Sequence, residues 1–138
     1  MKLFRLGAFA LLAVTAIAMT SCGKYEEGPG FSLLSKKARI TGEWTLSEVK
    51  VNGTAQDISG ATITVSIQKD GAYIVKWSSG GFSVEDAGTW KFSDDKTKLI
   101  VTDQDGDISE SEIVRLANKE LKLKDVDGTL ETVSTYVQ

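Results

Sequence analysis

Residues 61–78 read ATITVSIQKDGAYIVKWS, and the alternation in this stretch decides the fold class. Every second residue is a large apolar one on both sides of Asp70-Gly71, and this pair is typical of a tight turn. Because successive side chains of a strand point to opposite faces, the pattern predicts two antiparallel strands with one buried face. The alternating apolar residues are Ile63, Val65, Ile67, Tyr73, Val75 and Trp77.

Similar turn pairs recur along the rest of the chain. From Gly53 to Gly128 they lie about 11 residues apart, a spacing typical of all-β sandwiches and barrels. No helical period separates them, which argues against alternating strands and helices around a parallel sheet. The pairs are Asn52-Gly53, Ser59-Gly60, Asp70-Gly71, Gly80-Gly81, Asp94-Asp95, Asp105-Gly106, Asn118-Lys119 and Asp127-Gly128.

These signals predict an all-β fold, an eight-stranded antiparallel up-and-down β-barrel. Such a barrel has no free edges, and it either encloses one small ligand or fills with side chains. A short helix within Ser32–Ile40, capped by Ser32 or Ser35, is expected before it. A bulge near Ser47-Glu48 is needed to bring the apolar residues of the first strand into one phase. The predicted strands are 43–51, 61–68, 72–78, 87–93, 98–103, 108–117, 120–124 and 129–137.

Composition excludes several classes of function. The chain has 138 residues, no histidine and one cysteine, Cys22, which removes Ser-His-Asp triads, Cys/His zinc sites and internal disulfides. Beyond residues 1–21 it carries 14 basic and 19 acidic residues, which argues against nucleic-acid binding. We therefore expect no enzymatic activity, no cofactor, no metal and no nucleic-acid partner.

The first 21 residues have the pattern of a secretory leader. A basic start is followed by the uncharged run Leu6–Met19, which at 1.5 Å per residue spans only about 21 Å and is short for a membrane helix. Cys22 comes directly after the small residues Thr20 and Ser21. We interpret residues 1–21 as a removable signal peptide.

Met19-Thr20-Ser21-Cys22 resembles the lipobox of Gram-negative bacterial lipoproteins, whose cysteine is acylated as the leader is cleaved. The resemblance implies that Cys22 carries fatty acyl chains and anchors the protein in the cell envelope, at the outer membrane, with the face left open. Residues 22–30 hold three glycines and the only proline, so we expect an acylated flexible tether there. The acidic run Lys24–Glu27 is either an export signal or a solvated linker.

Gly42-Glu43-Trp44 opens the first predicted strand directly after the expected helix. Together with Lys69-Asp70-Gly71, the segment GTWKF at 88–92 and ELKL at 120–123, it resembles the lipocalin-like domains of bacterial lipoproteins. The resemblance implies that residues 31–138 form one such domain, which binds a small apolar ligand. It also implies that Trp44 closes one end of the barrel, beside a basic residue of the last strand. Since no arginine or lysine follows Lys124, either Arg39 or Arg115 takes that place or the closure is built differently.

Aromatic residues on the alternating strands are the candidates for the cavity wall. These candidate ligand-binding residues are Tyr73, Trp77 and Trp90, with Phe82 on the glycine-rich loop expected at 79–86. The alternative is a barrel packed solid, acting as an inhibitor or assembly subunit through the loops 79–86 and 103–110. The aspartates of the second loop do not fit the spacing of an EF-hand, and a solvated hairpin turn at Asp105-Gly106 is favoured over a calcium site.

Overall fold

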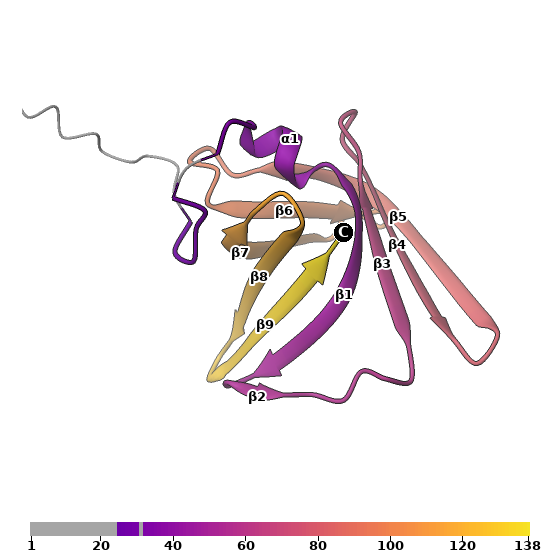
Figure 1. The fold of residues 1–138 in the computed structure, drawn as a ribbon. Helices are drawn as coiled ribbons and strands as arrows, with labels where there is room; N and C mark the ends of the chain where they lie inside the picture. The colour runs from indigo at the N-terminus through magenta and orange to yellow at the C-terminus, as the bar shows by residue number, and fades with distance from the viewer. Residues whose placement is uncertain (1–24, 31) are drawn as a thin grey trace, which may run out of the picture.

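A computed structural model describes residues 25–30 and 32–138, and the predicted signal peptide and Cys22 lie outside that part of the chain. One short helix precedes nine strands in the described residues (Figure 1). The elements are α1 (Lys36–Ile40), β1 (Gly42–Val51), β2 (Thr54–Ala55), β3 (Thr62–Ile67), β4 (Ala72–Ser79), β5 (Phe82–Phe92), β6 (Lys98–Asp103), β7 (Ile108–Leu116), β8 (Glu120–Asp127) and β9 (Leu130–Val137).

Eight of these strands form a closed antiparallel barrel in chain order. Neighbouring strands pair from β3 to β9, and β1 closes the ring by pairing with β3 through residues 42–45 and with β9 through residues 45–51. The two-residue strand β2 pairs only with the far end of β1. The register shift between Leu46 and Glu48 confirms the predicted bulge, and the up-and-down order agrees with the sequence-based prediction.

The structure differs from the predicted boundaries in three places. The helix has only five residues, capped by the Ser35 hydroxyl, which accepts a hydrogen bond from the Ala38 N–H. The expected loop at 79–86 is mostly strand, since β4 runs to Ser79, β5 starts at Phe82, and Gly80-Gly81 alone makes the turn. Strand β8 is also longer than predicted and reaches Asp127.

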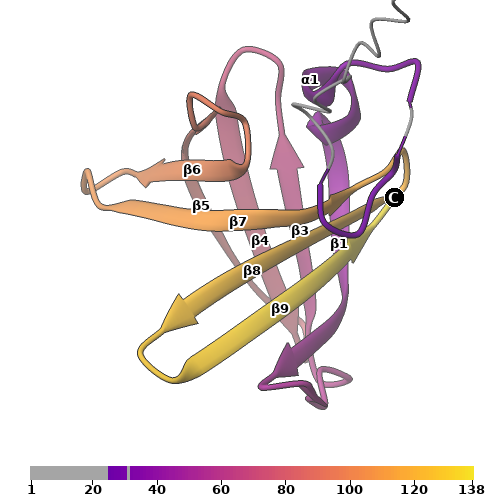
Figure 2. The ribbon, with the colours of Figure 1, turned by 90° about the vertical axis from the view of Figure 1, so that its left-hand side faces the viewer.

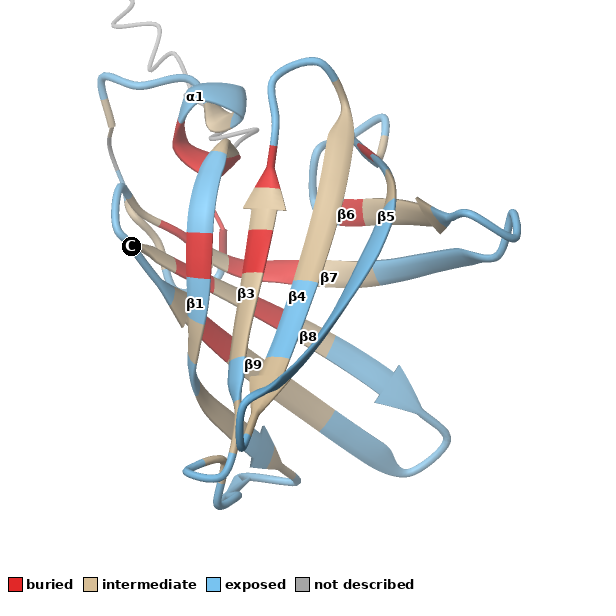
Figure 3. Cartoon of the chain, turned by 90° about the vertical axis from the view of Figure 1, so that its right-hand side faces the viewer, coloured by how far each residue is buried: buried red, intermediate tan, exposed pale blue. Residues whose placement is uncertain are grey.

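One end of the barrel is filled and covered. The largest fully buried side chains lie at the strand ends nearest α1, where red bands gather in Figure 3, while the opposite hairpin tips are exposed. Arg39 is buried there, and its Nη1 donates a hydrogen bond to the Leu116 carbonyl at 2.6 Å. Arg115 is only half-buried, so Arg39 is the arginine buried at this closed end. The fully buried side chains are Ile40, Trp44, Ile67, Leu99, Leu116 and Leu121.

Residues 25–30 pack against the barrel, unlike the flexible tether that their composition suggests. The β7–β8 register shift around Val114 frees backbone groups of β7, and this segment hydrogen-bonds to β7 there (Figure 2). The Glu27 N–H donates to the Val114 carbonyl at 2.8 Å, and the Glu27 carboxylate lies 2.7 Å from Lys122 Nζ.

Tyr25 fixes the start of this segment. It is 6% exposed, and its hydroxyl donates to the Lys96 carbonyl at 3.0 Å. Burial raises the pKa of Tyr25 to about 12, against the opposing effect of the Arg39 guanidinium. The chain therefore joins the closed end of the barrel already at residue 25.

Within residues 25–30 and 32–138, no helix is long and apolar enough to cross a membrane.

Gly88 permits the close approach of β5 to β6, and this gives a first testable prediction. A Cβ at this position would collide with the Thr102 carbonyl oxygen and would lie 3.2 Å from the Asp103 Cα, both backbone atoms. We expect Gly88→Ala to lower the free energy of unfolding by about 1–3 kcal/mol, as for other overpacked sites. Chemical denaturation checks this, with Gly60→Ala as the control, because nothing lies within 4 Å of a Cβ there. Equal stability of the two variants would contradict this packing.

Candidate ligand-binding cavity

The pairing register shows which side chains face the inside of the barrel. Trp44 pairs with Val65, Val65 with Val75, and Val75 with Asp86, so this row crosses four strands from the core into β5. Paired residues lie on the same face of a sheet. Since Trp44 is buried in the core, Val75 and Asp86 belong to the interior face as well.

The interior is divided into a filled half and a hollow half. Toward α1, the space between the core side chains has no room for a water molecule. The residues that close it are Trp44, Val65, Ile67, Tyr73, Leu99, Leu121, Leu123 and Tyr136. Above this packed floor the strands diverge. The pairing of β5 with β6 ends at Gly88 and Asp103, so residues 82–87 of β5 pair with β4 alone.

A half-open cavity of about 350 Å³ lies where β5 separates from β6. Its apolar wall consists of Tyr73 and Val75 from β4 and Val101 from β6. Its rim is polar and includes the carboxylates of Asp86, Asp103 and Asp105. The other lining residues are Ala87, Gly88 and Gln104.

Tyr73, Tyr136 and Asp125 lie close enough to one another on the interior face for their charges to interact. Burial holds the pKa of Tyr73 far above its ordinary value, and Tyr136 and the Asp125 carboxylate add to that shift. Burial and Asp125 raise the pKa of Tyr136 in the same direction. Ser111 Oγ donates to Asp125 Oδ1 at 2.6 Å and so helps to hold this carboxylate. Near neutral pH the two phenols are therefore neutral.

One comparison with known proteins identifies the family of the chain. The family model described as a lipocalin-like domain matches residues 40–123. The chain belongs to this lipocalin-like family. The match extends from the end of α1 into β8, so it covers the closed end and the cavity of the lipocalin-like domain alike.

Seven chains of solved structures also match the lipocalin-like domain. One of them is described as the de novo design of a fluorescence-activating β-barrel. It is 14% identical, covers 76% of this chain and 99% of its own, and has a TM-score of 0.43. The search of curated proteins gave no match.

The lipocalin-like domain does not gather the four aromatic residues that the sequence proposed for its cavity wall. Tyr73 lines the cavity, but Trp90 is buried beside it in the filled half, with its indole N–H donating to the Gln68 carbonyl at 2.7 Å. Trp77 and Phe82 lie near the tip of the β4–β5 hairpin, 38% and 62% exposed, with ring centroids 6.2 Å apart. Of the four, Tyr73 alone is among the residues that line this cavity.

Eight of the nine lining residues were absent from the sequence-based candidates, among them Val75, Val101, Asp86 and Asp103. The alternation of β4 already placed Val75 on the face of Tyr73, so its position was accessible from the pattern. That Asp86 faces the interior follows only from the row of paired residues that begins at Trp44. This row can be drawn only when the pairing of four strands is known. Asp103 is placed by its pairing with Gly88.

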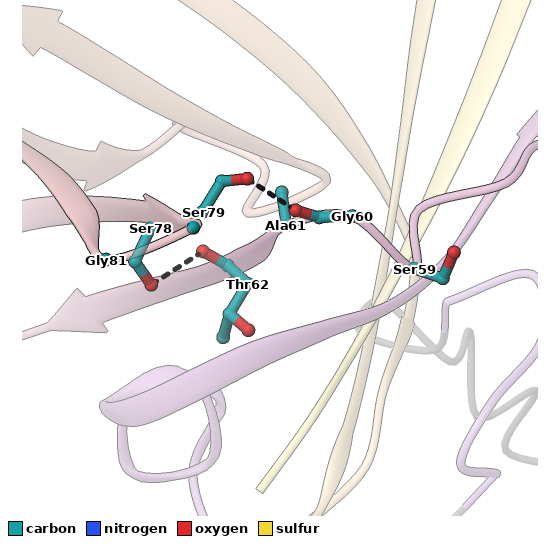
Figure 4. A pocket seen from close by; sticks show the side chains of 8 residues that line it. Ser59, Gly60, Ala61, Thr62, Ser78, Ser79 and Gly81 are labelled. Carbon is teal, nitrogen blue, oxygen red and sulfur yellow. Dashed lines mark hydrogen bonds between the residues drawn. The ribbon is translucent and has the colours of Figure 1, made fainter.

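A second hollow of about 260 Å³ lies between the β2–β3 connection and the β4–β5 turn (Figure 4). It is lined by small residues, and two of their hydroxyls already have partners. Ser79 Oγ donates to the Gly60 carbonyl at 2.6 Å, and Ser78 Oγ donates to the Thr62 carbonyl at 3.5 Å. This hollow lies at the surface and has no apolar side chain larger than alanine in its wall, so it is the weaker ligand site.

The aspartate-rich turn between β6 and β7 is held by its own hydrogen bonds. Asp103 Oδ1 accepts the N–H groups of Asp105 and Asp107, each at 2.9 Å, and Gly106 has a φ of +89°. This geometry confirms the hairpin turn expected at Asp105-Gly106. Among residues 25–30 and 32–138, no group of three acidic, cysteine or histidine residues is arranged to hold a metal ion.

Proposed function

We propose that the protein is a membrane-anchored lipoprotein whose lipocalin-like domain binds a small, mostly apolar molecule inside the barrel. The observation that carries the binding proposal is the cavity between β4, β5 and β6. Its volume of about 350 Å³ falls in the range of small-molecule sites, roughly 300–1,000 Å³, and its wall combines apolar side chains with a few polar groups. The filled half below it gives such a ligand a rigid floor.

A neutral indole alcohol, tryptophol, is a suitable first probe, because it has an apolar ring and one hydroxyl. The full chain is placed in lipid nanodiscs and titrated by calorimetry, with empty nanodiscs as the blank. We expect saturable binding to a single site, beyond the partitioning into lipid that the blank shows. Heats that match those of empty nanodiscs throughout the titration would exclude binding of this class of ligand.

Anchoring through Cys22 rests on the lipobox-like sequence rather than on the described residues. Two or three acyl chains are expected to hold the protein on a bilayer almost permanently, because each buried CH₂ contributes about 0.8 kcal/mol. In a Gram-negative host, the wild-type chain should fractionate with membranes and should carry the added mass of its acyl chains. The Cys22→Ser variant should lose both properties, and a wild-type chain with an unmodified Cys22 would refute the anchor.

Packing of Tyr25 against the closed end predicts how an anchored barrel sits on the bilayer. Only three Cα–Cα steps of about 3.8 Å separate Cys22 from Tyr25, so the closed end should face the membrane and the cavity should face away. Fluorophores attached through Lys119→Cys and Asp127→Cys, at opposite ends of β8, test this orientation. Lipids with quenchers on their headgroups should quench the label at 119 more strongly than the label at 127. Stronger quenching at 127 would reverse the orientation.

Exposed apolar side chains at the open end favour a second candidate function, binding of a protein partner. These residues lie near the hairpin tips and are Phe82, Ile108, Val126 and Leu130. Crosslinking in intact cells through a photoreactive residue at position 82 should capture a defined protein if this function holds. Absence of any protein adduct there would count against it and would leave the cavity proposal unaffected.

A further inference from the structure

We infer that the cavity selects an apolar organic cation, such as a protonated amine, over a neutral or anionic molecule of the same shape. This inference rests on the proposed binding of a small molecule in the same cavity. It follows from the sign of the charges on the interior face, from the absence of cations on the described strands of that face, and from the shape of the cavity.

Carboxylates of the interior face lie on three strands, and those of two strands line the cavity. Asp86 lines it from β5 and Asp103 from the end of β6. Asp125 of β8 accepts a hydrogen bond from Ser111, which pairs with the core residue Leu99 and therefore faces inward. The charge of Asp125 reaches the cavity wall, because it raises the pKa of Tyr73.

The lysines and arginines of the described strands all lie on the outer face. Lys98 pairs with Glu112, Glu112 with Lys124, and Lys124 with Val133, in a row next to the interior row of Leu99 and Ser111. Five ion pairs are formed in the described part of the chain, and none of them uses Asp86, Asp103, Asp105 or Asp125. The strand cations on the outer face are Lys50, Lys76, Lys91, Lys98, Arg115, Lys122 and Lys124.

The connections between strands show the same separation of charge. No lysine or arginine occurs in the connections at the open end, the end opposite α1. These connections are residues 52–61, 80–81, 104–107 and 128–129. Those at the closed end each contain one lysine: Lys69, Lys96 and Lys119. No basic side chain of these connections or of the described strands therefore neutralises the acidic rim.

The shape of the cavity strengthens the effect of these charges. Apolar walls of low dielectric constant concentrate the field of carboxylates that line a concave site. Such focusing raises the local concentration of an oppositely charged ligand about tenfold or more. A protonated amine could place its apolar part against Val75 and Val101 and direct its ammonium group toward Asp86 and Asp103. An anion in the same position would face uncompensated negative charge.

Three probes with one ring system and one spacer isolate the effect of charge. Tryptamine, tryptophol and indole-3-propionate carry an ammonium, a hydroxyl and a carboxylate, respectively, on the same ethylindole. With the full chain in nanodiscs, we expect tryptamine to bind about tenfold more tightly than tryptophol and indole-3-propionate to bind most weakly. The preference for tryptamine should shrink as salt is added.

Two neighbouring substitutions on β5 provide the matched control. Asp86→Asn keeps the size of a side chain that lines the cavity and removes its charge, so it should weaken tryptamine binding several-fold and weaken tryptophol binding clearly less. Glu85→Gln removes the same charge from the adjacent position, which pairs with Lys76 on the outer face, and should alter neither. Both residues are exposed, and unchanged circular dichroism spectra would show that both variants fold.

The outcomes separate this inference from the proposal on which it rests. Equal affinity for the three probes, or equal effects of Asp86→Asn and Glu85→Gln on tryptamine, would overturn the charge preference and leave ligand binding intact. Failure of all three probes to bind would instead remove the proposed function itself.

Discussion

Replacing Val101 with tryptophan is expected to weaken tryptophol binding at least about a hundredfold, a loss of roughly 2.7 kcal/mol in binding free energy. Val101 lies on the interior face of β6, paired with Trp90, and forms part of the cavity wall. An indole at this position would occupy the space that the probe needs. Calorimetry with the full chain in nanodiscs measures the effect directly.

The matched control for this variant is Ile100→Trp. Ile100 is the preceding residue of β6 and pairs with Lys91 on the outer face, so the same ring would project away from the cavity. Val101→Ala is a second variant that enlarges the cavity and should retain binding. Because overpacking costs about 1–3 kcal/mol, thermal unfolding must show that Val101→Trp is folded. Undiminished binding by a folded Val101→Trp variant would place the ligand elsewhere.

Trp44→Ala is expected to lower the free energy of unfolding by about 3–5 kcal/mol, the usual cost of truncating a buried tryptophan. Trp44 is 0% exposed and packs among core residues of several strands. Its indole N–H donates to the Ile40 carbonyl at 2.8 Å, which ties α1 to β1. Since domains of this size are stable by only about 5–15 kcal/mol, the loss is a large share of the total.

Trp77→Ala is the control for the loss of Trp44. The Trp77 side chain is 38% exposed near the tip of the β4–β5 hairpin, so its truncation should cost clearly less than that of Trp44. Urea denaturation of the two variants compares them under one condition. Similar losses of stability would mean that the closed end of the barrel contributes no more to the free energy of unfolding than the hairpin tip does.

Alternation and turn chemistry predicted the strands where one face is buried and the other is wet. Trp44 and Val65 show why this works, because each of them packs inward and lies between two polar residues of its strand. The beginning of β5 was missed because residues 82–87 pair with β4 alone and have no buried face. A strand whose side chains are all exposed needs no alternation of apolar and polar residues, so its sequence does not reveal it.

The packing of residues 25–30 could not be predicted from their composition. Glycine, proline and glutamate suggest a solvated segment, and only Tyr25 supplies a large apolar surface. The segment is held by backbone groups that the irregularity around Val114 leaves free. An irregularity of this kind depends on how two strands pair, so the segment alone gives no sign of its partner.

The candidate site was predicted less well than the fold. Aromatic side chains guided the choice of residues, and most of them fill the closed end or lie at a hairpin tip, with only Tyr73 on the cavity wall. The cavity itself arises where β5 and β6 stop pairing, at Gly88 and Asp103. The length over which two strands pair is a property of the whole barrel, and local residue patterns do not encode it.

The most direct test of the account is the position of bound tryptophol, measured by methyl NMR of the full chain in nanodiscs. Binding in the cavity predicts that the methyl groups of Val75 and Val101 shift on titration. The methyl groups of Ile100 and Val133, on the outer face, should stay in place. Shifts confined to the exposed tip residues Val126 and Leu130, or no saturable shift at all, would contradict a ligand-binding barrel.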